Sequence, residues 1–147
     1  MRPVLVLDTN VVVAGILGGS RDSPPSALVD GMLEGRFALL LSVALVAEYR
    51  EVLRRPKLRA LHELEDVEIE GLLERIVLEG MLREPVEGGS RGPDPEDRHL
   101  WELVATEDRA VLVTGDAALL ESPPEGASVV PPRAAVEMLG FPPEGGP

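Results

Sequence analysis

The chain has no cysteine among its 147 residues. This absence excludes a disulfide framework, a thiolate metal site and a cysteine nucleophile. No apolar run approaches the roughly 18 residues that a membrane helix needs, and the first residues do not resemble a signal peptide. We therefore expect a soluble, cytoplasmic protein with no membrane contact.

Aromatic residues are also scarce, at 3% of the chain. The core must therefore be built from leucine, valine and alanine rather than from rings. A chain of this length has room for one sizeable core. We expect a single domain over residues 1–140, followed by a disordered tail over residues 141–147.

Positive charge is in short supply. Lysine and arginine number 14 against 26 aspartates and glutamates, which gives a net charge of −12. Nonspecific binding to nucleic acid depends on basic patches, so this balance argues against a broad nucleic-acid surface. The sequence has one dense basic cluster, which could either bind RNA or form a solvated helix end favoured by the helix dipole. Its members are Arg54, Arg55, Lys57 and Arg59.

Two apolar runs each end on an aspartate. Residues 4–7 lead into Asp8, and residues 110–115 lead into Asp116. Runs that are apolar throughout are typical of strands buried on both faces, as in parallel α/β sheets. Ligands of such sheets bind at the carboxyl ends of the strands. If both strands belong to one sheet, Asp8 and Asp116 lie on the same edge.

The remaining pattern alternates helices with short strands. Ser42 is suited to cap one helix at its N-terminus, and Pro56 should end that helix. Glycine-rich loops over residues 18–23 and 88–92 should be mobile. Apolar spacing predicts helices over residues 10–17, 27–33, 42–54, 65–79, 94–104, 117–120 and 133–139, and further strands over residues 37–41, 81–86 and 128–130.

Two more acids point toward the core on a helical wheel. Glu48 borders the apolar face of its helix, and Asp97 shares a stripe with Leu100 and Trp101. Each acid also has an ordinary interpretation. Asp8 could cap the following helix, Asp94 and Asp97 could be a capping pair, and Glu48 could be a solvated edge residue.

Taken together, the four acids would place four carboxylates around one sheet edge. At ~4 Å and an effective dielectric constant of 20, each pair of like charges costs about 4 kcal/mol, so protonation or a cation is required. A cluster of oxygen ligands favours Mg²⁺ or Mn²⁺. Such ions activate water and reverse the local field where a phosphate must sit, which makes the acidic composition compatible with a nuclease.

Several segments, in order over about residues 3–121, resemble the PIN-domain family of metal-dependent ribonucleases. The resemblance is specifically to its bacterial VapC-like members, the toxins of toxin–antitoxin pairs. The matching segments are Val6-Leu7-Asp8-Thr9-Asn10, Leu41-Ser42-Val43 leading to Glu48-Tyr49, Val52-Leu53-Arg54-Arg55-Pro56-Lys57-Leu58, Asp94-Pro95-Glu96-Asp97 and Val113-Thr114-Gly115-Asp116-Ala117-Ala118-Leu119-Leu120.

The resemblance implies a Rossmann-like three-layer α/β/α fold with a central parallel sheet. It implies that Mg²⁺ or Mn²⁺ is held by Asp8, Glu48, Asp97 and Asp116 and that a metal-activated water hydrolyses RNA. Asp97 is preferred over Asp94 as the ligand. Ala117 and Ala118 stand where many relatives carry a further acid, so one ion is expected rather than two. The residues that would orient the carboxylates are Asn10, Thr114, Ser42 and Asp94.

The sequence supports other catalytic mechanisms less well. His62 and His99 are far apart in sequence and form no recognisable triad, so we expect both to be surface residues. An aspartyl-nucleophile phosphatase would need an acid two residues after Asp8, where Asn10 stands. A PIN-like module that binds RNA or protein without cutting is the main alternative to the nuclease. An antitoxin partner and a homo-oligomer are also expected, with the apolar helices near residues 28–33 and 72–77 as candidate surfaces, although core packing is their simpler use.

Overall fold

The two apolar runs that end on aspartates form neighbouring parallel strands. Every residue of β1 (Val4–Leu7) and β4 (Ala110–Val113) is buried. Their register places Leu7 opposite Val113. Asp8 and Asp116 therefore follow adjacent strands at the same carboxyl edge, and the predicted neighbourhood of the two acids is confirmed.

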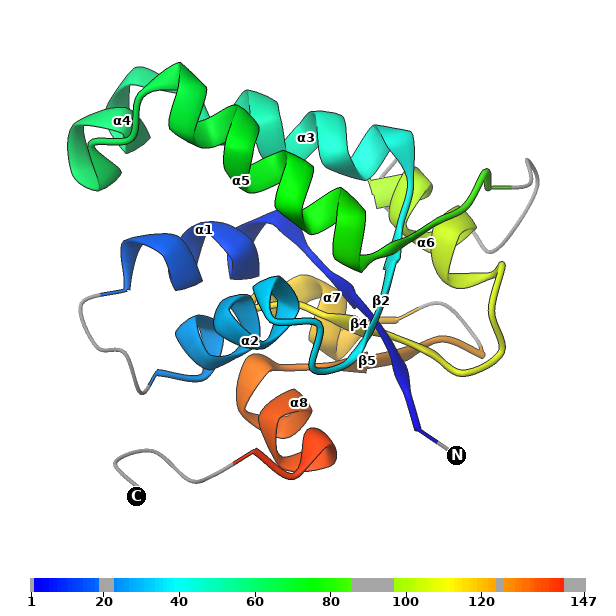
Figure 1. Cartoon of the computed structure of the whole chain (residues 1–147). Helices are drawn as coiled ribbons and strands as arrows, with labels where there is room; N and C mark the ends of the chain where they lie inside the picture. The colour runs from blue at the N-terminus through cyan, green and yellow to red at the C-terminus, as the bar shows by residue number, and fades with distance from the viewer. Residues whose placement is uncertain (1, 19–22, 86–96, 124–125, 142–147) are drawn as a thin grey trace.

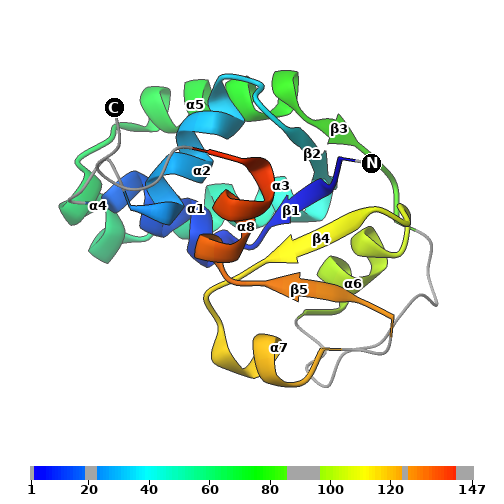
Figure 2. The same cartoon turned by 90° about the horizontal axis from the view of Figure 1, so that it is seen from below.

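The computed structural model of the chain describes residues 2–18, 23–85, 97–123 and 126–141. Within these residues the sheet has five strands in the order β3-β2-β1-β4-β5, and all neighbouring pairs are parallel. Figure 2 shows β4 running between β1 and β5. The other strands are β2 (Ala38–Leu41), β3 (Met81–Leu82) and β5 (Ser128–Val130). The third strand is thus much shorter than the predicted residues 81–86.

Helices flank the sheet, as the predicted three-layer α/β/α fold requires. In Figure 1, α3 and α5 lie above the strands and α8 lies below them. No helix within the described ranges is long and apolar enough to span a bilayer. The helices are α1 (Thr9–Leu17), α2 (Pro24–Leu33), α3 (Val43–Leu53), α4 (Pro56–His62), α5 (Asp66–Glu79), α6 (Arg98–Val104), α7 (Ala117–Glu121) and α8 (Pro132–Leu139).

Helix α4 was not predicted. Pro56 lies beyond the end of α3 and is the first residue of α4, a position at which its missing N–H costs nothing. Glu63, the residue that follows the helix, adopts a left-handed conformation with φ of 57°. The expectation that Pro56 only terminates a helix was therefore incomplete, because the same residue also starts the next one.

Apolar faces of the helices fill the space against the sheet. Leu28 and Met32 of α2 and Ile76 of α5 are buried, so core packing uses most of both helices. Gly15 of α1 lies so close to α2 that an added Cβ would come within 2.3 Å of a Val29 methyl carbon. Only glycine permits this close approach of the two helices.

Parts of the predicted loops and tail lie outside the described residues, namely 19–22, 88–92 and 142–147. Asp94 lies outside them as well. Phe141, the first residue of the predicted tail, contacts the Phe37 ring at a centroid distance of 6.3 Å and lies under the Arg36 guanidinium.

Candidate functional site

Asp8 stands where β1 ends and α1 begins. It is 7% exposed. One carboxylate oxygen, Oδ1, accepts a hydrogen bond from the Thr9 backbone N–H at 2.8 Å, which caps α1. The other, Oδ2, accepts from the Thr114 hydroxyl at 2.7 Å and from the Asn10 amide at 3.1 Å. The capping interpretation of Asp8 is therefore correct, but it accounts for only one of its oxygens.

Asn10 and Thr114 join the ends of β1 and β4. The Asn10 Oδ1 accepts from the Gly115 backbone N–H at 3.1 Å, so its amide nitrogen must face Asp8. The Thr114 hydroxyl accepts from the Asp116 backbone N–H at 3.0 Å while it donates to Asp8. The loop that carries Asp116 is thereby fixed beside Asp8.

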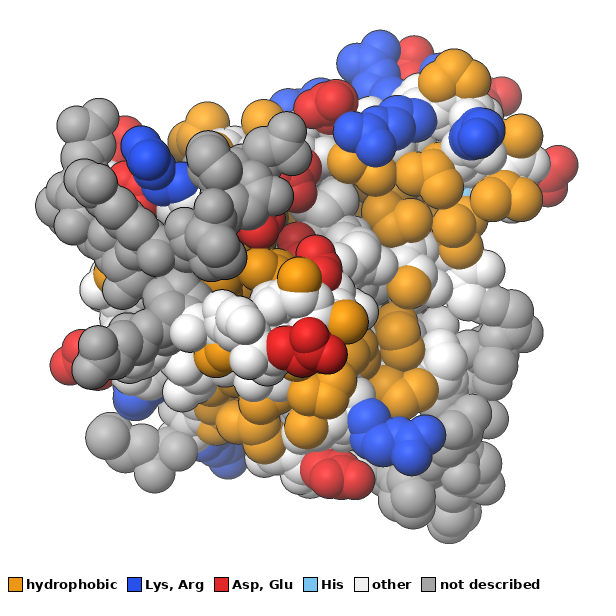
Figure 3. All heavy atoms as spheres, turned by 180° about the vertical axis from the view of Figure 1, so that it is seen from behind, with side chains coloured by type: hydrophobic (Ala, Val, Ile, Leu, Met, Phe, Trp, Pro, Cys, Tyr) orange, Lys and Arg blue, Asp and Glu red, His pale blue; other side chains and the backbone are white. Residues whose placement is uncertain are grey.

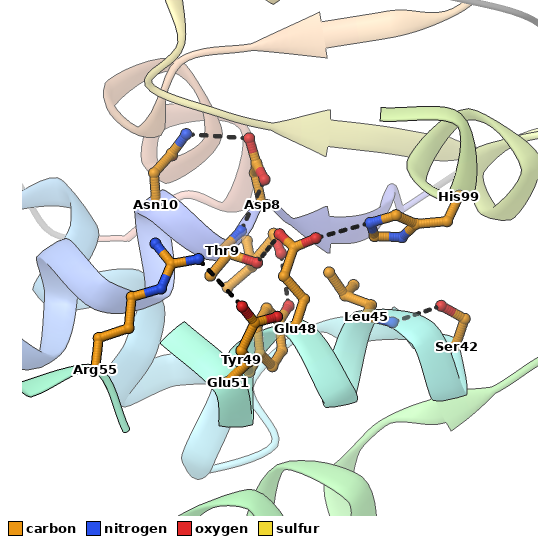
Figure 4. A network of polar contacts seen from close by, with 11 residues as sticks. Asp8, Thr9, Asn10, Ser42, Leu45, Glu48, Tyr49, Glu51, Arg55 and His99 are labelled. Carbon is orange, nitrogen blue, oxygen red and sulfur yellow. Dashed lines mark hydrogen bonds and ion pairs between the residues drawn. The ribbon is translucent and has the colours of Figure 1, made fainter. Parts of the chain in front are cut away.

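Glu48 reaches the same edge from α3. Ser42 caps that helix through the Leu45 N–H at 3.1 Å, as predicted, and so fixes where the helix starts. Figure 4 shows the Glu48 carboxylate between Thr9 and His99. It accepts from the Thr9 hydroxyl on one oxygen and from the His99 Nε2 on the other, the latter at 2.9 Å.

Tyr49, the next residue of α3, is fully buried and donates its hydroxyl to the Leu7 carbonyl at 2.6 Å. This bond ties α3 to the end of β1, one residue before Asp8. Burial and the charges of Asp8 and Glu48 raise the pKa of Tyr49 well above its ordinary value. The phenol is therefore neutral and acts as a donor.

The electrostatics of the site are dominated by its acids. Burial raises the pKa of Asp8 above its ordinary value. The hydrogen bonds from Thr114 and Thr9 lower it, and the charges of Glu48 and Asp116 raise it again. Within the described residues, no lysine or arginine forms an ion pair with any of these three carboxylates.

Asp116 and Asp97 occupy two different helix starts. Asp116 is exposed, and its Oδ1 accepts from the Ala118 N–H at 2.9 Å, which caps α7. Asp97 directly precedes α6 and makes no capping hydrogen bond to that helix among the described residues. It lies two residues before His99, which contacts Glu48. Its role as a ligand remains a prediction.

The donor set fits a hard divalent cation in its chemistry, because all of the acids offer oxygen. The raised pKa of buried Asp8, next to two further acids, means that added positive charge would stabilise its ionised form. However, no group of three or more His, Asp or Glu side chains in the described ranges converges on one point suited to a metal ion. The Glu48 and Asp116 carboxylates are each held by other donors.

The basic cluster lies at the end of α3 and on α4, where Lys and Arg side chains gather at the upper right of Figure 3. Three of its four side chains form ion pairs with acids of the same chain. Arg54 and Arg59 both pair with Asp66, at 3.5 and 2.7 Å, and Arg55 pairs with Glu51 at 3.4 Å. Lys57 is exposed and has no ion-pair partner among the described residues. Arg55 and Glu51 appear in the same close view as Asp8 and Glu48 (Figure 4).

The prediction that both histidines are surface residues is incomplete, because both are half-buried and make specific polar contacts. The His99 side chain is 23% exposed and contacts Glu48. His62 bridges two backbone groups, because its Nε2 lies 2.8 Å from the Leu53 carbonyl and its Nδ1 accepts from the Leu64 N–H. Neither contact leaves a periodic signal in the sequence, since the His99 contact depends on how α6 packs beside α3 and the His62 contacts depend on the backbone conformation around α4.

Comparison with known protein families agrees with the fold. The family model described as "PIN domain" matches residues 4–118. A search of curated protein sequences finds no match to the chain. The matched range covers β1 to the start of α7 and includes Asp8, Glu48, Asp97 and Asp116.

Proposed function

This chain belongs to the PIN-domain family, whose members are generally nucleases, and we propose that it is a divalent-metal-dependent endoribonuclease. The observation that carries the proposal is the buried Asp8 carboxylate at the sheet edge, within the influence of the charges of Glu48 and Asp116. Among the described residues no basic side chain neutralises it by an ion pair, so the charge must be offset by a proton or by a cation, and the proposal assigns a bound cation to this role.

In this proposal Asp8, Glu48, Asp97 and Asp116 hold one Mg²⁺ or Mn²⁺. When bound, the ion supplies an activated water and neutralises charge on the scissile phosphate. Asn10 and Thr114 keep the Asp8 oxygens in place, and Ser42 fixes the start of the helix that carries Glu48. Asp94, which lies outside the described residues, is proposed to help orient the carboxylates.

The direct test compares cleavage of single-stranded RNA by the full chain with Mn²⁺ and with a chelator. Asp8→Asn should abolish Mn²⁺-dependent cleavage, because amide replacement removes the buried charge. Glu34→Gln is a matched acid-to-amide control at the other end of the strands, where Glu34 is exposed, and should cleave normally. Cleavage by a folded Asp8→Asn variant at the wild-type rate would refute the assignment.

The toxin role is a further part of the proposal. Induced expression of the wild-type chain should arrest bacterial growth, and expression of the Asp8→Asn variant should not. An antitoxin protein and a homo-oligomer are the proposed partners, and the cytoplasm is the proposed location. Exposed apolar residues on α3 and β3, among them Val43 at 71% and Leu82 at 53%, offer an apolar contact surface. Light scattering at several concentrations tests the oligomer.

The two alternatives make different predictions. A silent PIN-like module would bind RNA or a protein without cutting it, and would show no Mn²⁺-dependent cleavage even as wild type. An aspartyl-nucleophile phosphatase is disfavoured because Asn10 stands where that mechanism needs an acid. The Asn10 side-chain amide is hydrogen-bonded to both Asp8 and Gly115. Trapping of a phosphorylated Asp8 would be required to revive that mechanism.

A further inference from the structure

We propose that His99 is a positioning residue of this site, which restrains the Glu48 carboxylate at the sheet edge and so favours cation binding there. The inference rests on the proposed metal-dependent function. His99 is not one of the site residues predicted from the sequence. It reaches Glu48 from α6, whereas Thr9, the other partner of Glu48 among the described residues, belongs to α1.

The contact is direct. His99 Nε2 lies 2.9 Å from Glu48 Oε2, and the two side chains are 23% and 34% exposed. Because an ionised carboxylate only accepts hydrogen bonds, the ring nitrogen is the donor. Thr9 donates its hydroxyl to the opposite oxygen, Oε1. Figure 4 shows His99 reaching Glu48 from α6, on the side away from Thr9.

Two donors on different oxygens fix both the position and the plane of the carboxylate. A free glutamate side chain has several rotatable bonds, and ordering it on cation binding costs conformational entropy. The contacts with Thr9 and His99 impose much of this order before a cation arrives. Each carboxylate oxygen has two acceptor sites, so one site on each oxygen stays available to a cation. The arrangement therefore orients Glu48 without blocking it.

The other ring nitrogen argues against a purely structural role. His99 Nδ1 is buried and has no hydrogen-bond partner among the described residues. An unpaired buried polar atom costs free energy, and an apolar side chain of similar size at this position would avoid that cost. The imidazole is thus a poor choice for packing alone. Among the described residues, the polar contact that its side chain makes is the one from Nε2 to Glu48.

The experiment compares two substitutions that differ in the donor. His99→Gln can place an amide N–H near the position of Nε2, and His99→Leu removes the donor with little change in volume. Mn²⁺ affinity is measured without RNA, by electron paramagnetic resonance of the free ion. We expect His99→Leu to weaken Mn²⁺ binding about 10–100-fold and His99→Gln to restore most of it. Arg98→Leu, an exposed neighbour on the same helix, is the control and should bind Mn²⁺ as wild type does.

Cleavage kinetics give a second readout. At saturating Mn²⁺ the KM for RNA should be unchanged in His99→Leu, while the Mn²⁺ concentration for half-maximal rate should rise in step with the weaker affinity. If His99→Leu fails to fold, His99→Asn replaces it, since the shorter amide cannot reach Glu48 as glutamine does. Folding is checked by circular dichroism and urea unfolding.

The outcomes separate this inference from the proposed function. If wild type binds Mn²⁺, Asp8→Asn does not, and His99→Leu binds as wild type does, the role of His99 is refuted and the nuclease stands. If His99→Gln binds as poorly as His99→Leu, the donor is not what matters, and the role is again refuted. If wild type itself binds no Mn²⁺, the proposed function fails, and this inference fails with it.

Discussion

Thr114 offers the sharpest test of how the site holds its buried charge. Its side chain is fully buried, donates to Asp8 Oδ2 at 2.7 Å and accepts from the Asp116 N–H at 3.0 Å. Thr114→Val keeps the shape of the side chain and removes only the hydroxyl. The variant therefore removes the hydrogen bond to the buried carboxylate, together with the weaker bonds that the hydroxyl accepts from the Asp116 N–H and, at 3.4 Å, from the Asn10 amide.

The size of the effect follows from the charge of the acceptor. Hydrogen bonds to charged groups contribute about 1.5–3 kcal/mol, against about 0.5–1.5 kcal/mol for neutral pairs. The Asp116 N–H also loses its acceptor, but Asp116 is exposed and water can replace the hydroxyl. We expect Thr114→Val to lower the free energy of unfolding by about 2–3 kcal/mol at neutral pH.

The effect should depend on pH in a defined direction. Burial raises the folded-state pKa of Asp8 above its unfolded value. Stability from this group is thus fully present below the unfolded pKa, about 3.9, and is lost as the pH rises through the folded pKa. The Thr114 bond lowers the folded pKa and limits that loss. Without the bond the loss is larger, so the destabilisation should grow as Asp8 ionises.

Urea unfolding of the metal-free protein over roughly pH 5 to pH 8 measures this dependence. The single tryptophan, Trp101, is buried and reports unfolding by fluorescence. Thr106→Val is the matched control, because the Thr106 hydroxyl donates to the neutral Leu103 carbonyl at 2.7 Å. Its cost should be about 0.5–1.5 kcal/mol at every pH. A Thr114→Val cost that is equally small and equally flat with pH would refute the reasoning.

Three further predictions use other parts of the site. Tyr49→Phe leaves the Leu7 carbonyl without its buried donor and should lower the free energy of unfolding by about 1–2 kcal/mol across the same pH range, by urea titration. The Tm of metal-free Asp8→Asn relative to wild type should rise as the pH rises through the folded pKa of Asp8, because only wild type then carries a buried charge; a relative Tm that rises on acidification would contradict the direction of the Asp8 shift. Arg55→Gln should weaken binding of single-stranded RNA and reduce the magnitude of the slope of log affinity against log salt concentration by about 0.7. Arg109→Gln, just before β4 at the far end of the strands, is the control and should change neither quantity. Equal slopes for wild type and both variants would show that Arg55 does not contact RNA.

The fold and the paired acids were predictable because their signals are local. A strand buried on both faces must be apolar at every position, and that pattern marks β1 and β4 directly in the sequence. Once both strands are parallel neighbours, the residue after each lies on one edge. Asp8 and Asp116 therefore follow from the backbone alone. Glu48 required a helical wheel as well, and the predicted Ser42 cap fixed its register.

The features that escaped prediction depend on packing between distant segments. His99 and Glu48 are 51 residues apart in sequence, and their contact exists because α6 packs beside α3. The only sequence signal was the place of His99, two residues after the predicted ligand Asp97. The second role of Pro56, as the start of α4, was missed because a proline after a helix reads equally as a stop or as a new first residue.

The acidic composition of the chain should affect the order in which the cation and RNA bind at the site. The arginines best placed to attract RNA are paired with Asp66 and Glu51, while Asp8 and Asp116 have no basic ion-pair partner among the described residues. The unbalanced charge at the sheet edge is therefore negative and would repel a phosphate. A divalent cation reverses that field, so RNA binding at the site should follow cation binding rather than precede it. In filter-binding assays with the Glu48→Gln variant and wild type, affinity for an uncleavable RNA analogue should rise with Mn²⁺ in wild type and much less in the variant. Equal RNA affinity with and without Mn²⁺ in wild type would show that the arginines alone suffice.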